Sequence, residues 1–140
     1  MKTIYTAEAL ATGEGRNGHA RTSDGLLDVE LAIPEAMGGN GQGTNPEQLF
    51  AAGYAACFHS ALQLVARQNK ADVTDSAVGA RVGIGPNDQG GFQLEVTLEV
   101  TLPNLGRDEA QALADKAHEV CPYSNATRGN IDVTVTVTED

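Results

Sequence analysis

Apolar residues recur at every third or fourth position through residues 44–70, and this spacing predicts a long α-helix. Asn45 can cap its first turn, Pro46 suits the first helical position, and Gln48 stands three residues after the cap, as in a capping box. We expect one stripe of mostly small residues to face inward: Leu49, Gly53, Ala56, Cys57, Ser60 and Leu64. Small side chains allow close approach, so the stripe suggests packing against a second helix or a copy of this one.

Alternation of apolar and polar residues predicts strands in most of the remaining chain. The clearest period of two runs through residues 92–102, which we expect to form a hairpin with residues 76–84 around the turn GPNDQGG. Residues 2–11, 19–22 and 26–33 are predicted as a meander of three antiparallel strands separated by glycine-containing turns, and residues 130–138 as a closing strand.

A second amphipathic helix is predicted over residues 107–120, and its apolar face continues to Cys121. Pro122 ends or kinks it, because an internal proline removes a hydrogen bond and clashes with the preceding turn. The order βββ-α-ββ-α-β predicts an α+β fold, with a largely antiparallel sheet covering the first helix. A chain of 140 residues is the size of one domain, so residues 1–140 are predicted to form a single domain.

Charge and hydropathy narrow the classes of function. A net charge of −10 and a pI near 4.5 argue against nucleic acid and against anionic membrane surfaces, because both need a basic face. The glycine-rich residues 38–43 lack the following Gly-Lys-Ser/Thr of a phosphate-binding loop. No signal or transit pattern is visible, and no apolar run reaches about 18 residues. We therefore expect a cytosolic protein that acts without a membrane.

The two cysteines, Cys57 and Cys121, each lie on an apolar helical face. In a reducing compartment they are unlike a permanent disulfide, which leaves two inert core thiols, a metal site or a redox pair. His118 and Cys121 share a helical face, but Cys57 and His59 point about 200° apart and cannot bind one ion on a continuous helix. We expect no metal and no cofactor.

A reactive thiol needs a nearby cation, because an unperturbed cysteine has a pKa of about 8.5 and an apolar site raises it. The chain has only nine Lys and Arg residues, and Arg16 differs from most of them because it lies in a glycine-rich turn that permits close approach. Glu47 lies in the first turn of the predicted long helix, where the helix dipole favours a negative charge. Considered by itself, Glu47 is better explained as a helix-start charge than as a catalytic group.

Three stretches, TNPEQLFAAGYAACFHSAL, VCPYSNATRGNIDV and the early GRNG, make the chain resemble the organic hydroperoxide resistance proteins of the Ohr/OsmC family. The resemblance covers essentially the whole chain. It implies the OsmC-like fold, with antiparallel sheets wrapped around central helices in an intertwined homodimer. It also implies a peroxidase that reduces organic hydroperoxides, including those of fatty acids, to alcohols. The implied reductant is a dihydrolipoyl group of a lipoylated protein rather than thioredoxin.

The resemblance also implies the site residues. Cys57 corresponds to the peroxidatic cysteine and Cys121 to the resolving cysteine, which together pass through a sulfenate and a disulfide. Arg16 and Glu47 match the pair that orders and activates the thiolate. The loop between them is about one residue shorter than the family pattern, which leaves Arg21 as the alternative to Arg16.

The spacing of Glu47 and Cys57 bears on how such a site is assembled. Ten residues on a continuous helix separate them by about 15 Å along the axis and about 80° around it. An Arg16–Glu47 pair therefore cannot easily serve Cys57 of the same helix, and we expect the site to be shared across a homodimer. A non-enzymatic binding module with two core thiols, and an OsmC-like or metal-binding relative, remain as alternatives.

Overall fold

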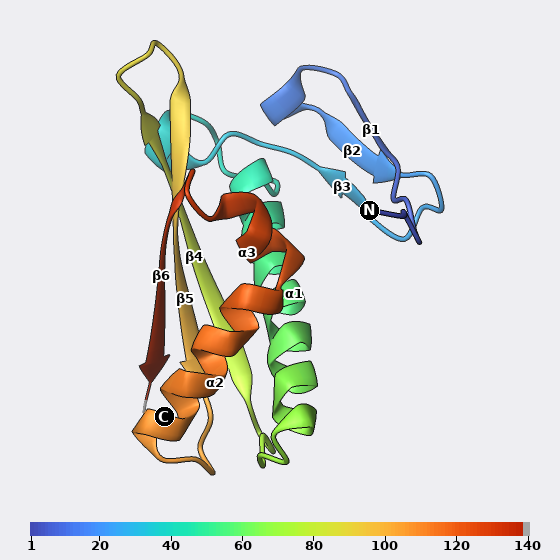
Figure 1. Cartoon of the computed structure of the whole chain (residues 1–140). Coiled ribbons are helices and arrows are strands. Elements are labelled where there is room, and N and C mark those ends of the chain that lie inside the picture. Colours follow the sequence, from blue (N-terminus) through green and yellow to red (C-terminus); the bar gives the residue numbers. More distant parts are fainter. Residues whose placement is uncertain (139–140) are drawn as a thin grey trace. The chain divides into compact units, whose positions relative to one another are not determined.

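The computed structural model describes residues 1–138, shown as a cartoon in Figure 1. Its elements are, in chain order, β1 (Ala9–Thr12), η1 (Gly15–Asn17), β2 (His19–Thr22), β3 (Asp28–Glu30), η2 (Glu35–Met37), α1 (Pro46–Gln68), β4 (Ala77–Pro86), β5 (Phe92–Thr101), α2 (Arg107–Val120), α3 (Pro122–Thr127) and β6 (Asp132–Thr138). The observed class is α+β, as predicted. The chain divides into two compact units, one from Met1 to Leu49 and one from Phe50 onward. The prediction of a single domain stays a prediction.

The first unit contains a three-stranded antiparallel sheet in the order β1-β2-β3, which confirms the predicted meander. The outer strands are shorter than predicted: residues 2–8 lie outside β1, and β3 covers only three residues. The partner strand explains both differences. β2 has four residues and then turns after Thr22, so beyond its ends only single backbone bonds remain, from Ser23 N–H to the Glu8 carbonyl and from Leu31 N–H to the Gly18 carbonyl.

The predicted start of α1 is confirmed. The Asn45 side chain accepts a hydrogen bond of 2.8 Å from the backbone N–H of Gln48, as an N-cap does, and Pro46 is the first helical residue. In a capping box the Gln48 side chain would accept a hydrogen bond from the backbone N–H of Asn45. Here it instead accepts a hydrogen bond of 2.7 Å from the Thr44 hydroxyl.

The prediction of which face of α1 is buried is wrong. The side chains that α1 buries belong to a neighbouring stripe: Tyr54, Phe58, Ala61, Leu62, Val65 and Ala66. Of the predicted inward stripe, Ala56, Ser60 and Leu64 are exposed and Cys57 is half-buried. Large side chains remove more apolar area from water than small ones, so the larger stripe takes the core in this chain. The small-residue stripe is left on the surface of the single chain.

The second unit contains a sheet in the order β4-β5-β6, with β5 between the other two strands (Figure 1). The β4–β5 hairpin confirms the prediction. β6, however, runs parallel to β5, so this part of the predicted antiparallel sheet is wrong. The connection from β5 to β6 passes through α2 and α3, and such a helical crossover returns the chain to the end from which β5 started.

The core of the second unit joins α1, β5 and α2. Its largest members are fully buried or nearly so: Tyr54, Phe58, Leu62, Val65, Val96, Leu98, Val100, Leu113 and Cys121. The alternation predicted for β5 therefore places Val96, Leu98 and Val100 inward. Phe92, at the hairpin end of the same strand, is 71% exposed and does not join them.

Helix α1 is also long and apolar enough to cross a membrane, with a mean hydropathy of 1.4 over its best 18-residue window. The expectation that no apolar run is long enough to span a membrane is therefore wrong by this test. The core helix of a soluble protein passes the same test, so the finding is weak support for a membrane. The buried stripe that α1 packs against β5 and α2 accounts for its apolar character.

His19 on β2 joins two carboxylates of β3. Its Nδ1 lies 2.6 Å from Glu30 Oε1, and its Nε2 lies 2.5 Å from Asp28 Oδ1. The hydrogen bond to Glu30 is the largest effect and raises the pKa of His19; desolvation opposes it, and the hydrogen bond to Asp28 then adds to the rise. The protonated ring therefore holds the two strands together electrostatically.

This pairing predicts a pH-dependent contribution to stability. Because the folded-state pKa of His19 is raised, its contribution is fully present below the unfolded pKa of about 6.5 and is lost as pH rises through the folded value. We expect His19→Gln to lower the free energy of unfolding more at about pH 5.5 than at about pH 9. Denaturant titrations of both proteins measure this difference, and an equal effect at both pH values would contradict the assignment.

Candidate functional site

The two cysteines meet where α1 contacts the junction of α2 and α3. The Sγ atoms of Cys57 and Cys121 are 3.6 Å apart, and both cysteines are free thiols. Cys57 is half-buried, whereas Cys121 has no exposed surface. A disulfide requires about 2.05 Å between the sulfurs, so a small movement would join them. The structure thus brings together the two thiols that the sequence singled out.

The position of Cys121 follows from the Cys-Pro sequence. Its N–H makes the last bond of α2, to the carbonyl of Ala117 at 2.8 Å, and its own backbone is extended, with φ −60° and ψ 123°. Pro122 then occupies the first position of α3, where its missing N–H is not needed. Proline therefore ends α2, as predicted, and also starts a short helix that the sequence analysis did not predict.

The surroundings of Cys57 within the second unit disfavour its thiolate. Burial raises the pKa of the Cys57 thiol, a hydrogen bond from the backbone N–H of Tyr123 opposes that rise, and Cys121 adds to it. An apolar pocket thus keeps the thiol protonated unless a positive charge is supplied.

Arg16 and Glu47 form a two-pronged ion pair in the first unit. The guanidinium Nη1 and Nη2 donate to the two oxygens of Glu47 at 2.8 and 2.7 Å. The hydrogen bond from Arg16 lowers the pKa of the Glu47 carboxyl, and the same bond raises the pKa of Arg16. Arg21, the alternative, lies 3.9 Å from Asp28 and is well exposed. The structure pairs Arg16, not Arg21, with Glu47.

A glycine turn holds Arg16 in place. Arg16 lies in η1 between Gly15, whose φ is +65°, and the buried Gly18. A Cβ on Gly18 would lie 2.1 Å from the carbonyl oxygen of Thr12, so no other residue fits there. The glycines of the early GRNG motif are therefore needed for the backbone turn that positions the guanidinium of Arg16.

Helix α1 carries both Glu47 and Cys57 without a break. On a continuous helix the ten intervening steps correspond to about 15 Å along the axis. A helix that began later would have changed this spacing, and the start of α1 at Pro46 excludes it.

Three aromatic residues that the sequence analysis did not single out pack together where α1 contacts α3. The rings of Phe50, Tyr54 and Tyr123 lie 5.6–6.0 Å apart. A Cβ on Gly53 would lie 2.8 Å from the Tyr123 hydroxyl, so Tyr123 covers this glycine on α1. A glycine inside a helix costs about 1 kcal/mol relative to alanine. Its presence at position 53 was therefore the one feature of the sequence that could have indicated a close contact here.

The second unit has an apolar groove of about 590 Å³, which neither cysteine lines but which is linked to Cys57 through Tyr123. Its lining includes the side chain of Tyr123, whose backbone N–H contacts Cys57. The lining residues are Phe50, Pro122, Tyr123, Ala126, Thr127 and Ile131. The groove carries no charged side chain and suits an apolar ligand.

The histidines considered as metal ligands have other partners. His59 Nε2 lies 2.8 Å from the Ser76 hydroxyl, and His118 Nδ1 lies 2.7 Å from the Ser124 hydroxyl. Among residues 1–138, no three His, Cys, Asp or Glu side chains gather where an ion could bind.

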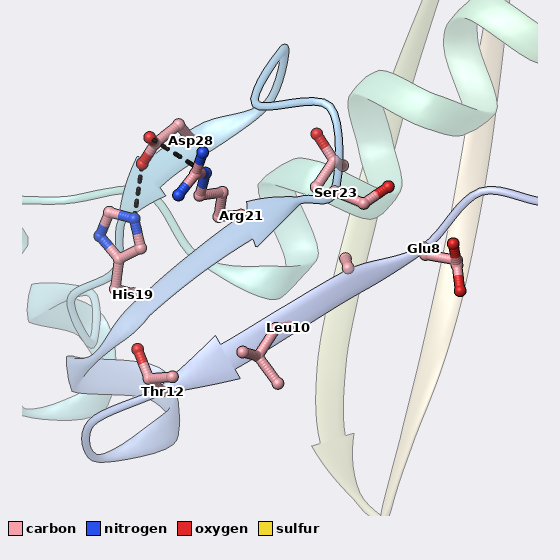
Figure 2. Close-up of a pocket in the computed structure, with 9 residues that line it drawn as sticks. Glu8, Leu10, Thr12, His19, Arg21, Ser23 and Asp28 are labelled. Atoms are coloured by element: carbon pink, nitrogen blue, oxygen red, sulfur yellow. Dashed lines mark ion pairs between the residues drawn. The ribbon is translucent and has the colours of Figure 1, made fainter.

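A larger hollow, of about 660 Å³, lies on the sheet of the first unit (Figure 2). Asp28 there pairs with both His19 and Arg21, so these charged groups are already engaged with one another. No residue that lines this hollow contacts either cysteine in the way that Tyr123 of the apolar groove contacts Cys57, and we do not assign the chemistry to it.

Comparisons with known proteins agree with this geometry. The profile of the family described as OsmC-like protein matches residues 39–136. An organic hydroperoxide resistance protein of Xanthomonas axonopodis pv. citri is 54% identical, over 97% of this chain and 96% of its own length. The organic hydroperoxide resistance protein OhrB of Bacillus subtilis is 48% identical, over 93% of this chain and 95% of its own length.

Solved structures show the same fold. The organic hydroperoxide resistance protein OsmC of Legionella pneumophila superposes with a TM-score of 0.93 at 52% identity, covering 98% of this chain and 99% of that one. The OhrB structure of Bacillus subtilis gives 0.88 at 46% identity, over 97% of this chain and all of that one. With its fold and nearly its whole length shared with such proteins, this chain belongs to the organic hydroperoxide resistance proteins of the Ohr/OsmC family.

Proposed function

We propose that this protein removes organic hydroperoxides by reducing them to alcohols with a cysteine-based peroxidase mechanism. The observation that carries the proposal is the approach of the Cys57 and Cys121 sulfurs to 3.6 Å, with Cys57 half-buried beside an apolar groove. Relatives over the full length are named for organic hydroperoxide resistance, which supports the same class of substrate here.

In the first step the Cys57 thiolate attacks the distal oxygen of the hydroperoxide. A sulfur lone pair forms the S–O bond, the O–O bond breaks, and the leaving alkoxide takes a proton to become the alcohol. Cys57 is oxidised by two electrons to a sulfenic acid, and the peroxide is reduced by the same two.

In the second step Cys121 attacks the oxidised sulfur of Cys57. The S–S bond forms as the S–O bond breaks, and hydroxide leaves with the thiol proton as water. This disulfide keeps a second peroxide from carrying Cys57 to sulfinate. An external dithiol then reduces the disulfide by exchange. We propose the dihydrolipoyl group of a lipoylated protein, in the cytoplasm, as that reductant.

Arg16 supplies the positive charge that the thiolate requires. Burial raises the pKa of Cys57, so a guanidinium beside the sulfur is needed to favour its ionised form. Glu47 holds Arg16 through two charge-assisted bonds, which fix its planar donors for the sulfur and the peroxide.

We propose that the site is shared between two copies of the chain. Glu47 and Cys57 are separated by about 15 Å on one continuous helix, so Arg16 and Glu47 would serve Cys57 of the partner subunit. The small-residue stripe of α1, with Ala56 and Ser60 exposed in the single chain, offers a surface on which a second copy can pack closely.

The apolar groove favours organic hydroperoxides over hydrogen peroxide. An acyl chain gains free energy by leaving water for the groove, at about 0.8 kcal/mol for each buried CH₂ group, and hydrogen peroxide gains none of it. Differential binding of this kind determines the preference between substrates.

We expect the purified protein to oxidise dihydrolipoamide in the presence of a fatty-acid hydroperoxide, and much more slowly with hydrogen peroxide. Loss of the dithiol and formation of the alcohol measure the reaction. Cys57→Ser should reduce turnover to background while the protein stays folded, because no thiolate remains to attack. A binding module with two core thiols would instead show no turnover in the wild type.

Removing the resolving thiol should separate the two steps. We expect Cys121→Ser to reduce about one equivalent of hydroperoxide per chain and then to accumulate sulfinate on Cys57, because no thiol captures the sulfenic acid. Mass spectrometry of the intact protein measures the oxygen atoms added. Continued cycling of Cys121→Ser with a dithiol at the wild-type rate would show that another group resolves Cys57.

Mixed dimers test whether the site is shared. Cys57→Ser and Arg16→Ala are each expected to be inactive alone. After equimolar exchange of subunits, half of the dimers contain one of each, and each of these has one complete site. We therefore expect about a quarter of the wild-type activity. Activity that stays at background in the mixture, while mass spectrometry shows that mixed dimers have formed, would exclude shared sites.

A further inference from the structure

Three buried hydroxyls and one half-buried histidine form a hydrogen-bonded cluster one helical turn from the two thiols. The Tyr54 hydroxyl of α1 lies 2.8 Å from the Ser124 hydroxyl and 3.1 Å from that of Thr127, both on α3. His118 Nδ1, on α2, lies 2.7 Å from the same Ser124 hydroxyl. Tyr54 and Ser124 have no exposed surface, and Thr127 is almost fully buried. We call these four residues the hydroxyl clamp.

The protons of the hydroxyl clamp can be assigned by counting donors. Thr127 donates its single proton to the Ser124 carbonyl at 3.1 Å, so Tyr54 must donate to Thr127. Ser124 must then donate to Tyr54, and His118 must donate from Nδ1 to Ser124. Only this set of directions satisfies all four contacts, so every member depends on the next.

The protonation of His118 agrees with that assignment. Burial, followed by the nearby charge of Arg128, lowers the pKa of His118, which favours the neutral ring. The neutral ring with its proton on Nδ1 can donate to Ser124 as the count requires. The hydroxyl clamp is thus fully hydrogen-bonded without any buried charge.

The hydroxyl clamp and the thiols belong to one contact between helices. Tyr54 and Cys57 are three residues apart on α1, so they lie on one side of it. Cys121 and Ser124 are also three apart, at the start of α3. The bond from Tyr54 to Ser124 therefore holds the same two segments as the contact from Cys57 to Cys121, one turn away.

We propose that Tyr54, Ser124 and His118 are positioning residues for the resolving step, which the hydroxyl clamp serves by holding Cys121 at attack distance from Cys57. This inference rests on the proposed peroxidase function and deepens it. The sulfurs must close from 3.6 Å to about 2.05 Å for the S–S bond to form. A misplacement of about 1 Å can slow a positioned reaction by about a hundredfold.

The consequence is a competition at the oxidised Cys57. Its sulfenic acid is captured by Cys121, with loss of water, or it reacts with a second hydroperoxide to give sulfinate and another alcohol. Cys121 is buried, so its attack depends on its position in the fold. Loosening the hydroxyl clamp slows the capture and leaves the first reaction with peroxide in place.

The test uses Tyr54→Phe, which removes one hydroxyl and keeps the ring, and Ser124→Ala. Each reduced protein is mixed with increasing fatty-acid hydroperoxide, and disulfide and sulfinate are counted by mass spectrometry. We expect disulfide formation to slow by about tenfold to a hundredfold, with sulfinate rising at correspondingly lower peroxide. Consumption of the first equivalent should stay within about twofold of wild type.

The double variant supplies a readout that a general loss of stability would not give. Because the two hydroxyls act as one unit, Tyr54→Phe with Ser124→Ala should slow disulfide formation no more than the stronger single change. Thr101→Val is the matched control, since it removes a 2.7 Å bond between the hydroxyls of Thr101 and Thr138 on β5 and β6. It should leave the partition between disulfide and sulfinate at the wild-type value.

The possible outcomes separate this inference from the proposed function. If the wild-type protein consumed no hydroperoxide, the proposed peroxidase function itself would be contradicted. A wild type that forms its disulfide, beside single variants with unchanged sulfinate, would overturn only the role of the hydroxyl clamp. Thr101→Val raising sulfinate as much as Tyr54→Phe would also overturn it, because loss of any hydroxyl–hydroxyl bond would then suffice.

Discussion

The burial of the large-residue face of α1 against β5 and α2 determines where both thiols lie. Tyr54 and Phe58 fill the core, and this rotation of the helix leaves Cys57 to one side of them, at the edge of the buried region. On the other side, the Cys-Pro break ends α2 so that Cys121 is fully buried at 3.6 Å from Cys57. The closeness of the two sulfurs thus arises from hydrophobic packing and one proline, because close-packed interiors leave little freedom to reposition a side chain.

The same burial disfavours the charged form of the Cys57 thiol, and the proposed role of Arg16 and Glu47 follows from this. Removal from water raises the pKa of the Cys57 thiol, while nucleophilic attack needs the thiolate. The chain carries few cations, and it fixes one of them, Arg16, through a glycine turn and two bonds to Glu47. Shared sites in a homodimer would bring that charge to the thiol without breaking α1, and the exposed small-residue stripe would accommodate the second copy.

The local structure and the family of this protein could be predicted from its amino-acid sequence. Caps and prolines mark helix ends through local hydrogen bonds, so the start of α1 at Pro46 and the extent of α2 were predictable. Alternation identified the β4–β5 hairpin for the same local reason. The long motifs around Cys57 and Cys121 also identified the family, because they specify residue types at many adjacent positions.

The tertiary structure decided everything that depends on distant partners. Helical periodicity fits two neighbouring stripes of α1 equally well, and only packing selects the larger one. The length of β1 and the parallel direction of β6 depend on the strands beside them, since a strand is completed by its neighbour's hydrogen bonds. The hydrogen bond between Tyr54 and Ser124 joins residues 70 positions apart, and no local pattern in the sequence predicts it. The residue types that can react are therefore written in the sequence, whereas their separation, burial and proton directions exist only once the chain has folded.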